Sequence, residues 1–444
     1  MDLHEWIEKM KELQVNILNY IEMEYQEETN FDNLVTFIKD QKIYEKKQEM
    51  KIFLYILNQI SNNHYRYPHF YPKFEKILLL FAKEIQKYYS NLEIFKIFKD
   101  NKRILLFLIE EKILNIDETI IQEMNAEKYK KKYYLEYFSP EIKMFLEEFI
   151  QTHQNKMCPK ELENIYKSVQ EFSIDDINLF NQKRKRGEND NLLCQMIQND
   201  SIEEFITFVA KENYSLKSEI DISIFETNPL LLNQNQITLI EYCTFFGSIQ
   251  IFQYLYKNKV KLTKSLWLYA IHGKSEMIIH LLEENNCTLN LYWSEQKNES
   301  KTKKYSKQEN DSESDDDSES DDDLIFKNNS DLNESISLEK CLIETIKCHH
   351  NDMTEYMVQN FISEEFYMPN QHYFFFSSSK GLQYYNFLYF PQIMKNEHFL
   401  FYACKYDYYN IVEFLMKTKR INIKSKVVQI LIFFLIRLIF MIII

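Results

Sequence analysis

Hydrophobic side chains recur every three or four positions along the first part of the chain, which is the period of an amphipathic α-helix. Met10, Leu13 and Ile17 follow this spacing near the start, and the apolar positions of residues 74–88 repeat it. No alternation of period two persists long enough to indicate a sheet. The pattern therefore predicts an all-α N-terminal helical region over residues 1–180.

After residue 192 the hydrophobic pattern changes to a repeated template. Counted from a first apolar residue, mostly small or apolar residues follow at +3, +4, +11, +12, +15 and +16, and a turn residue stands at +7. Copies of the template begin at Leu193, Ile240, Leu266, Leu342 and Leu400. Their turn residues at +7 are Asp200, Gly247, Gly273, His349 and Asp407.

The template has a simple structural explanation. A short helix packs small residues against its neighbour, the chain turns at +7, and a second helix returns with an apolar stripe. Glycine takes a left-handed turn conformation without a steric penalty, and aspartate is the next most tolerable residue there. One helix pair cannot bury its apolar face alone, so the pattern predicts pairs that stack in series.

The repeated template resembles the ankyrin repeat. More closely, the chain is similar to a large protozoan family of degenerate ankyrin proteins with a helical N-terminal region of unassigned function. The residues that carry this resemblance are Ile60–His64, Asn101–Glu111, Ser201–Phe205, Ile224–Asn228, Thr238–Tyr256, Ser265–Gly273 and Tyr402–Tyr406. The Thr-Pro-Leu-His signature of consensus ankyrin is missing, and the intervals between copies are irregular. The resemblance implies an all-α fold, an α-solenoid of ankyrin-like helix pairs that binds other proteins.

The predicted repeat motif consists of small, apolar and turn-forming residues. These are Thr238, Cys243, Gly247, Leu255, Leu266, Ala270, Gly273, Leu281, Leu282, Leu400, Ala403, Asp407, Val412 and Leu415. Composition divides the rest of the chain into segments. The predicted order after the N-terminal region is a basic connector (181–191), repeats (192–293), a disordered acidic insert (294–337), repeats (338–426) and a hydrophobic tail (427–444).

The charge and the glycine count exclude several kinds of partner. The formal net charge is −14, and the ten acidic residues of Glu309–Asp323 account for most of it, which leaves a nearly balanced remainder. A general nucleic-acid-binding charge is therefore absent. Only four glycines occur in the whole chain, far apart, so a phosphate-binding loop is not expected. We expect no nucleic acid, no cofactor and no small-molecule substrate.

The acidic insert carries candidate phosphorylation sites. Ser312, Ser314, Ser318 and Ser320 each have an aspartate three residues downstream, the pattern that an acid-directed kinase prefers. Four phosphates would add roughly −6 to −8 of charge and regulate docking onto a basic partner. The alternative is an unmodified, solvated loop.

Cysteine and histidine provide no convincing catalytic or metal motif. The seven cysteines include no CxxC pair and are expected to be reduced, mostly buried thiols. Cys348, His349 and His350, with Cys341 upstream, are metal-capable, but no second ligand pair has suitable spacing, so a structural role is expected. His272 is expected to cap the end of a helix. Without a catalytic constellation we expect no enzyme activity and no metal.

These features predict a non-enzymatic, cytoplasmic adaptor for an unidentified protein partner, with exposed tips at residues 259–264 and 285–290. One alternative is a tail-anchored membrane protein that holds a partner at a membrane through the same repeats. Another is a nuclear factor imported through the bases Lys183–Arg186, which otherwise form a solvated connector.

The tail-anchor alternative rests on Val427–Ile444, where fifteen of eighteen residues are Ile, Leu, Phe or Val. As a helix this segment would span roughly 27 Å, near the minimum for a bilayer. Its apolar residues contribute about −5 to −9 kcal/mol to insertion, against about +3 kcal/mol for Arg437. A reading-frame slip in an AT-rich sequence would give a similar run, and this explanation stays open.

The anchor hypothesis predicts a difference between the full-length chain and a chain that ends at Lys426. After alkaline-carbonate extraction of membranes, only the full-length chain should remain in the pellet. Recovery of both chains in the supernatant would contradict an anchor and direct the partner search to the cytosol.

Overall fold

The computed structural model describes most of the chain. The described residues are 3–22, 27–64, 66, 70–126, 131–152, 160–234, 236–285, 287, 336–361, 371–390 and 397–417. The acidic insert with its four candidate serines, apart from its last residues 336–337, and the tail 427–444 lie outside them. In the described part of the chain, no helix has the length and hydrophobicity needed to cross a membrane.

The described part is almost entirely helical, which confirms the all-α prediction. The N-terminal helices are α1 (Leu3–Glu22), α2 (Glu27–Asp40), η1 (Ile43–Glu45), α3 (Lys47–Asn63), α4 (Phe70–Leu80), α5 (Ala82–Tyr88), α6 (Asn91–Phe98), α7 (Lys102–Glu110), α8 (Glu118–Ala126), α9 (Lys131–Tyr137), α10 (Ser139–Thr152), α11 (Lys160–Glu171) and α12 (Ile177–Arg186). The only strands among the described residues are β1 (Glu219–Ile220) and β2 (Ile237–Thr238), which pair antiparallel.

Each copy of the sequence template forms a pair of short helices. The pairs are α13 (Leu192–Gln198) with α14 (Ile202–Lys211), α16 (Leu239–Phe246) with α17 (Ile249–Lys257), α18 (Leu266–Gly273) with α19 (Glu276–Glu284), α20 (Leu338–Lys347) with α21 (Asn351–Phe361), and α24 (Glu397–Lys405) with α25 (Tyr409–Lys417). Between them lie α15 (Pro229–Leu232), α23 (Gln371–Gln383) and η2 (Phe387–Tyr389).

The turn inside a pair follows the prediction in four of the five copies. Asp200, Gly247, His349 and Asp407 have φ angles of 49°, 66°, 58° and 63°. In each case the next residue donates its N–H to the carbonyl at position +3 of the template, over 2.8–3.0 Å. This bond closes the first helix and turns the chain into the second.

The fifth turn differs from the prediction. Gly273 is the last residue of α18, and Lys274 takes the left-handed conformation with φ 45°. Gly273 is required there for a different reason, because a Cβ atom on it would lie only 2.4 Å from the carbonyl oxygen of Thr244. The glycine therefore permits the close approach of α16 and α18 rather than the turn.

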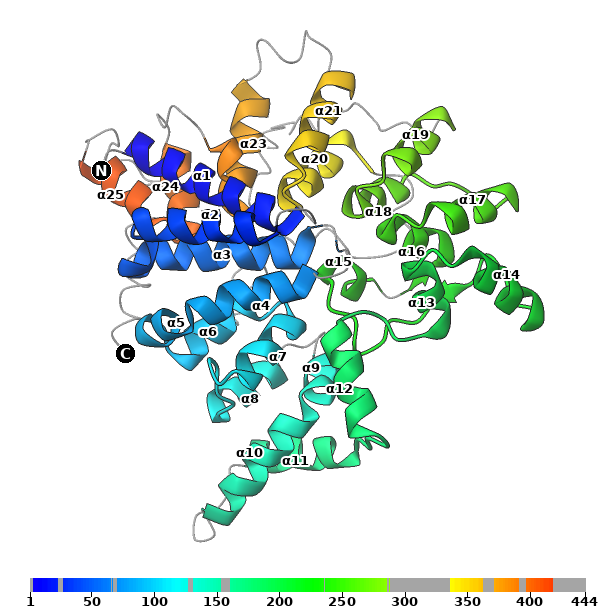
Figure 1. The fold of residues 1–444 in the computed structure, drawn as a ribbon, viewed down its shortest axis with the longest axis horizontal. Coiled ribbons are helices and arrows are strands. Elements are labelled where there is room, and N and C mark those ends of the chain that lie inside the picture. Colours follow the sequence, from blue (N-terminus) through cyan, green and yellow to red (C-terminus); the bar gives the residue numbers. More distant parts are fainter. Residues whose placement is uncertain are drawn as a thin grey trace, which may run out of the picture.

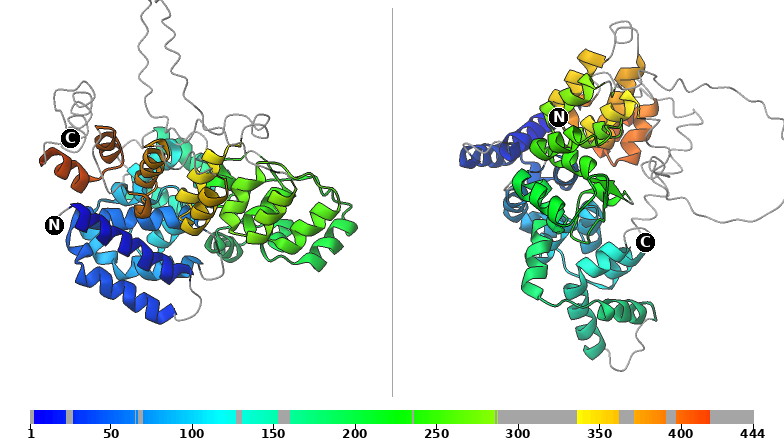
Figure 2. Two further views of the ribbon diagram at one scale, coloured as in Figure 1. Left: turned by 90° about the horizontal axis from the view of Figure 1, so that it is seen from above. Right: turned by 90° about the vertical axis from the view of Figure 1, so that its right-hand side faces the viewer.

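The first helices of successive pairs contact one another along the chain. The contacts run from α13 to α16, α18, α20, α23 and α24, and together these helices follow an arc (Figure 1). The helices α1–α4 lie against this arc, where α1 contacts η2 and α25, and α3 contacts α15. Helices α10 and α11 project from the rest of the molecule (Figures 1 and 2).

Two hydrophobic cores hold these helices together. One contains apolar side chains of residues 193–287 and 336–358, which belong to the part of the arc from α13 to α21. The other combines the N-terminal helices with residues of α23–α25, including Leu382, Tyr408 and Leu415. The chain therefore returns to its own beginning, and the first and last helices share one core. Figure 2 shows them together at one end of the molecule.

The predicted basic connector differs from the observed structure. Lys183, Arg184, Lys185 and Arg186 form the last turn of α12, and Gly187 ends the helix with φ 72°. Arg184 is buried and binds Glu141 through both terminal nitrogens. The other three bases pair with Asp190, Glu110 and Glu188. All four bases thus lie in a helix and are paired, and Arg184 is buried, whereas Lys183, Lys185 and Arg186 remain partly or fully exposed.

Gly273 and Gly247 should respond differently to substitution by alanine. Gly273→Ala should lower the free energy of unfolding by about 1–3 kcal/mol or more, because its Cβ would clash with the backbone of α16. Gly247→Ala should cost about 1–2 kcal/mol through its left-handed conformation. Gly247→Asn should cost less than Gly247→Ala, while Gly273→Asn should be worse than Gly273→Ala. Urea unfolding followed by circular dichroism measures all four. A cost below about 0.5 kcal/mol for Gly273→Ala would contradict the close approach.

Candidate functional site

The predicted motif residues lie mainly in the cores of the helix pairs. Cys243, Leu255, Leu266, Ala270, Leu282, Leu400, Ala403 and Leu415 are buried, whereas Leu281 and Val412 are half-buried. Thr238 precedes α16 and forms a reciprocal pair of hydrogen bonds with Glu241, which fixes the start of that helix. Of the six described cysteines, five are buried. These residues hold the helix pairs together. The surfaces that could bind a partner are formed by other residues.

The side that carries the turns inside the pairs is largely covered by the N-terminal helices. Lys51 of α3 forms an ion pair with the turn residue Asp407. Glu22, at the end of α1, pairs with the turn residue Lys274 over 3.1 Å. His64 contacts the carbonyl of Cys348, directly before the turn residue His349. The chain therefore occupies this side with its own first helices.

Among the segments between pairs, the loop from α17 to α18 is exposed, whereas the segment before α15 contacts α3, and η2 contacts α1. In the loop from α17 to α18, Lys257, Lys259 and Lys261 are exposed, and no acidic residue stands between Lys257 and Lys264. Of the tip predicted at residues 259–264, Lys259 and Lys261 are exposed, Val260 is buried, and residues 262–264 are half-buried. At the other predicted tip Asn285 is half-buried, and residues 286 and 288–290 lie outside the described part.

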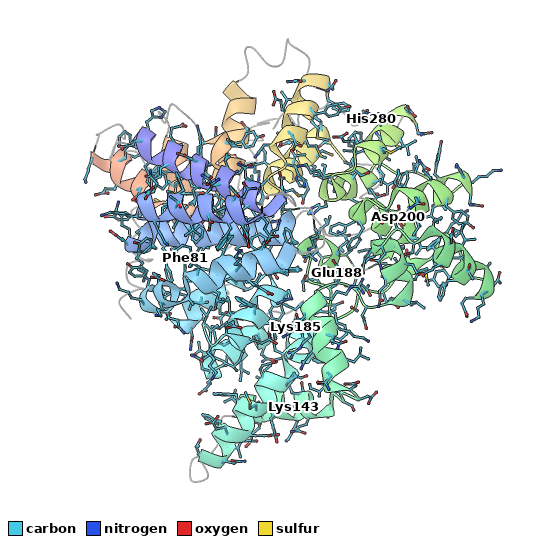
Figure 3. All side chains as sticks on the ribbon, viewed as in Figure 1. Phe81, Lys143, Lys185, Glu188, Asp200 and His280 are labelled. Carbon is cyan, nitrogen blue, oxygen red and sulfur yellow. The ribbon has the colours of Figure 1, made fainter. Side chains whose placement is uncertain are left out.

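Asp200 shows how neighbouring pairs are tied together. Its carboxylate accepts hydrogen bonds from the backbone N–H groups of Gln250 and Ile251, each over 3.0 Å, at the start of α17. Figure 3 labels Asp200 beside α16 and α17. The turn residue of one pair therefore caps the second helix of the next, which was not predicted from the template.

Buried polar groups fill the junction between the N-terminal helices and the arc. Asn386 accepts a hydrogen bond from Gln14 of α1 over 2.9 Å, and its amide donates to Ile346 and Asn351, each over 2.9 Å. Gln14 in turn accepts from the N–H of Phe387 over 2.7 Å. Both side chains are completely buried. This network joins α1, the end of α20, the start of α21 and η2.

A second polar contact fixes the segment before α15. Asn228 donates to the carbonyl of Asn62 over 3.0 Å, and Tyr71 hydrogen-bonds Thr227 over 2.9 Å. The buried Glu226 lies 3.5 Å from Arg66. Glu188, whose pKa is raised by burial, lies in the same region between α12 and α15 (Figure 3). Because these groups are buried and paired, they hold the segment before α15 in place against the N-terminal helices.

Histidines gather at the centre of the junction. His64 follows α3, His350 precedes α21, and their ring centroids are 4.6 Å apart. Nε2 of His64 lies 3.1 Å from Oε1 of Glu22. One ligand atom from each of Glu22, His64 and His350 can be chosen so that all lie within 4.8 Å of one another. The three residues therefore form a group with metal-binding geometry.

A neighbouring group contains His272, Glu344 and Cys348, whose ligand atoms also lie within 4.8 Å of one another. Nε2 of His272 lies 2.7 Å from Oε1 of Glu344 and 3.5 Å from Sγ of Cys348. His272 is thus a buried hydrogen-bond partner of Glu344 that stacks on Phe245, and not the helix cap that was expected. Lys347 also pairs with Glu344 over 3.3 Å.

Burial and charge set the ionisation of this centre. Burial alone would raise the pKa of Glu22, but the hydrogen bond and charge of His64 and the ammonium of Lys274 outweigh it and lower that pKa to about 2. Burial lowers the pKa of His349 to about 3 and holds the pKa of His350 well below its usual value. Burial raises the pKa of the Cys348 thiol. These shifts favour neutral imidazoles at His349 and His350 and an ionised carboxylate at Glu22.

Sequence reasoning found only part of this centre. Cys348, His349 and His350 were noted as metal-capable, and the turn position of His349 is confirmed by its φ of 58°. Glu344, four residues before Cys348, was not singled out, and Glu22 and His64 were not connected with the others because His64 is 284 residues from Cys348 in sequence. Such separations leave no spacing signal, and only the return of the chain onto α1 and α3 brings the groups together.

No family model, curated protein or solved structure matches this chain.

The polar junction predicts a large effect of one asparagine. Asn386→Ala should lower the free energy of unfolding by about 2–4 kcal/mol, because it leaves buried groups of Gln14 and Ile346 without partners. Asn360→Ala is the matched control, since Asn360 makes an exposed bond to the carbonyl of Tyr356 and should change stability by less than about 0.5 kcal/mol. Denaturant unfolding of both variants checks the difference. Similar small effects would mean that the junction contributes little.

Proposed function

We propose that this protein is a non-enzymatic cytoplasmic adaptor whose helix pairs form an ankyrin-like solenoid that binds a partner protein. What supports the proposal is the left-handed turn residue with its closing hydrogen bond, which recurs at the same template position in four helix pairs. The continuous series of helix contacts from α13 through α16, α18, α20 and α23 to α24 also supports it. Stacks of this kind present extended surfaces that suit protein recognition.

The proposed binding surface is the side with the loops between pairs. The opposite side is engaged by α1 and α3 through Glu22, Lys51 and His64. The loop after α17 offers Lys257, Lys259 and Lys261 to solvent. Three exposed ammonium groups so close together favour a partner with an acidic surface, and they would increase its rate of association.

Charge reversal of this loop tests the proposal. A chain with K257E, K259E and K261E should bind its partner roughly tenfold more weakly or worse, because attraction at the surface becomes repulsion. The control carries K39E, K83E and K87E, which reverse exposed lysines of α2 and α5.

The measurement has two steps. Proteins that copurify with the wild-type chain from cytosol are identified first, and the affinity of each purified candidate is then measured with the wild type and both triple variants. Loss of binding only with the loop variant supports the proposed surface. Equal binding by all three chains would place the binding surface elsewhere, and loss with both triple variants would indicate a non-specific charge effect.

A further inference from the structure

We propose that Glu22, His64 and His350 bind a divalent transition-metal ion of the zinc type, and that this ion fastens the N-terminal helices to the helix pairs. The three residues come from the end of α1, the end of α3 and the turn between α20 and α21. Two imidazole nitrogens and one carboxylate oxygen form a ligand set that zinc commonly accepts, with a remaining position for water. The inference stands apart from the proposed partner surface.

The protonation of His64 is the first argument. Its Nδ1 lies 2.9 Å from the carbonyl oxygen of Cys348, which only accepts, so Nδ1 carries a proton. Because Nδ1 is engaged by this carbonyl, Nε2 is the nitrogen that would coordinate an ion, and it lies 3.1 Å from Oε1 of Glu22. A backbone carbonyl that holds the far nitrogen of a histidine is the usual support of a metal ligand.

His350 is the second argument. It is completely buried, and neither of its ring nitrogens has a hydrogen-bond partner among the residues that the structure describes. An unpaired buried polar group costs about 1–3 kcal/mol, and this ring has two of them. Coordination by one nitrogen would remove part of that cost.

The distance between two of the ligands fits coordination. Neighbouring ligand atoms of a tetrahedral zinc ion lie about 3.3 Å apart, since Zn–N and Zn–O bonds are about 2.0–2.1 Å long. The observed 3.1 Å between His64 and Glu22 is close to this value. The ligand atom of His350 lies within 4.8 Å of the other two and would move closer on binding the ion. Glu22 is partly exposed, which gives an ion a route from solvent. Lys274, which also contacts Glu22, has a second partner in Asp352 at 3.4 Å and can release the carboxylate.

The neighbouring group of His272, Glu344 and Cys348 is a weaker candidate. Nε2 of His272 and the carboxylate of Glu344 already satisfy each other at 2.7 Å, and Lys347 neutralises the carboxylate further. The ring of His350, in contrast, has no other partner in the described part of the chain. The ligand atoms also differ, because only the neighbouring group contains a thiol, and this difference can be measured.

Zinc titration of the full-length chain tests the proposal. The chelator-treated, reduced chain should bind one Zn²⁺ in competition with a chromophoric chelator, and Zn²⁺ should raise its Tm because it binds only the folded state. His350→Phe should weaken Zn²⁺ binding by more than the roughly 10–100-fold that loss of a supporting residue costs. The matched control is His280→Phe, which changes an exposed histidine of α19 (Figure 3) and should leave the affinity unchanged.

Two further readouts keep the test decisive. Without zinc, His350→Phe should be at least as stable as the wild type, because it removes an unpaired polar ring. With Co²⁺, the wild type should show visible ligand-field bands but no thiolate charge-transfer band. Absence of stoichiometric binding, or equal Zn²⁺ affinity of His350→Phe and wild type, would overturn the proposal. A charge-transfer band that disappears in Cys348→Ser would assign the metal to the neighbouring group instead.

Discussion

The structure depends on a simple constraint, which is that none of its helix pairs can bury its apolar face alone. The helices are short, for example seven residues in α13 and nine in α17, and helices of this length are not stable in water without packing. Each first helix must therefore lie against the first helix of the next pair. The same requirement applies at the end of the arc, where α1 covers η2 and α25 and joins the N-terminal helices to the last pairs in one core.

This closure has consequences for both sides of the arc. The turns inside the pairs carry the polar groups that meet the N-terminal helices, so that side is filled by buried asparagines, histidines and ion pairs. The side with the loops is left for partners, and its lysines are solvated. A metal ion at Glu22, His64 and His350 would act on the first side only, where it would strengthen the joint without altering the proposed binding surface.

The sequence predicted what depends on local spacing and missed what depends on the return of the chain. The helical class and the turns at Gly247 and Asp407 followed from apolar periodicity and from the conformational tolerance of single residues. The turn at Gly273 was misplaced by one residue, because the glycine is needed for the approach of α16 to α18 and sequence spacing does not show this. The basic run 183–186 was predicted to be a solvated connector. Its pairing partners include Glu141 and Glu110, which belong to helices distant in sequence. The histidine centre was found only in part, because Cys348, His349 and His350 are adjacent in sequence whereas Glu22 and His64 are distant from them.

The central claim is that the N-terminal helices and the last helix pairs form one cooperative unit. Hydrogen exchange of the full-length chain, measured by mass spectrometry over a series of urea concentrations, tests it most directly. Amides of α1 around Leu13 and amides of α24 and α25 around Ala403 and Leu415 should lose protection at the same urea concentration, because these side chains share a core. If α24 and α25 exchange at low urea while α1 keeps its protection, the two parts are independent and the account is wrong.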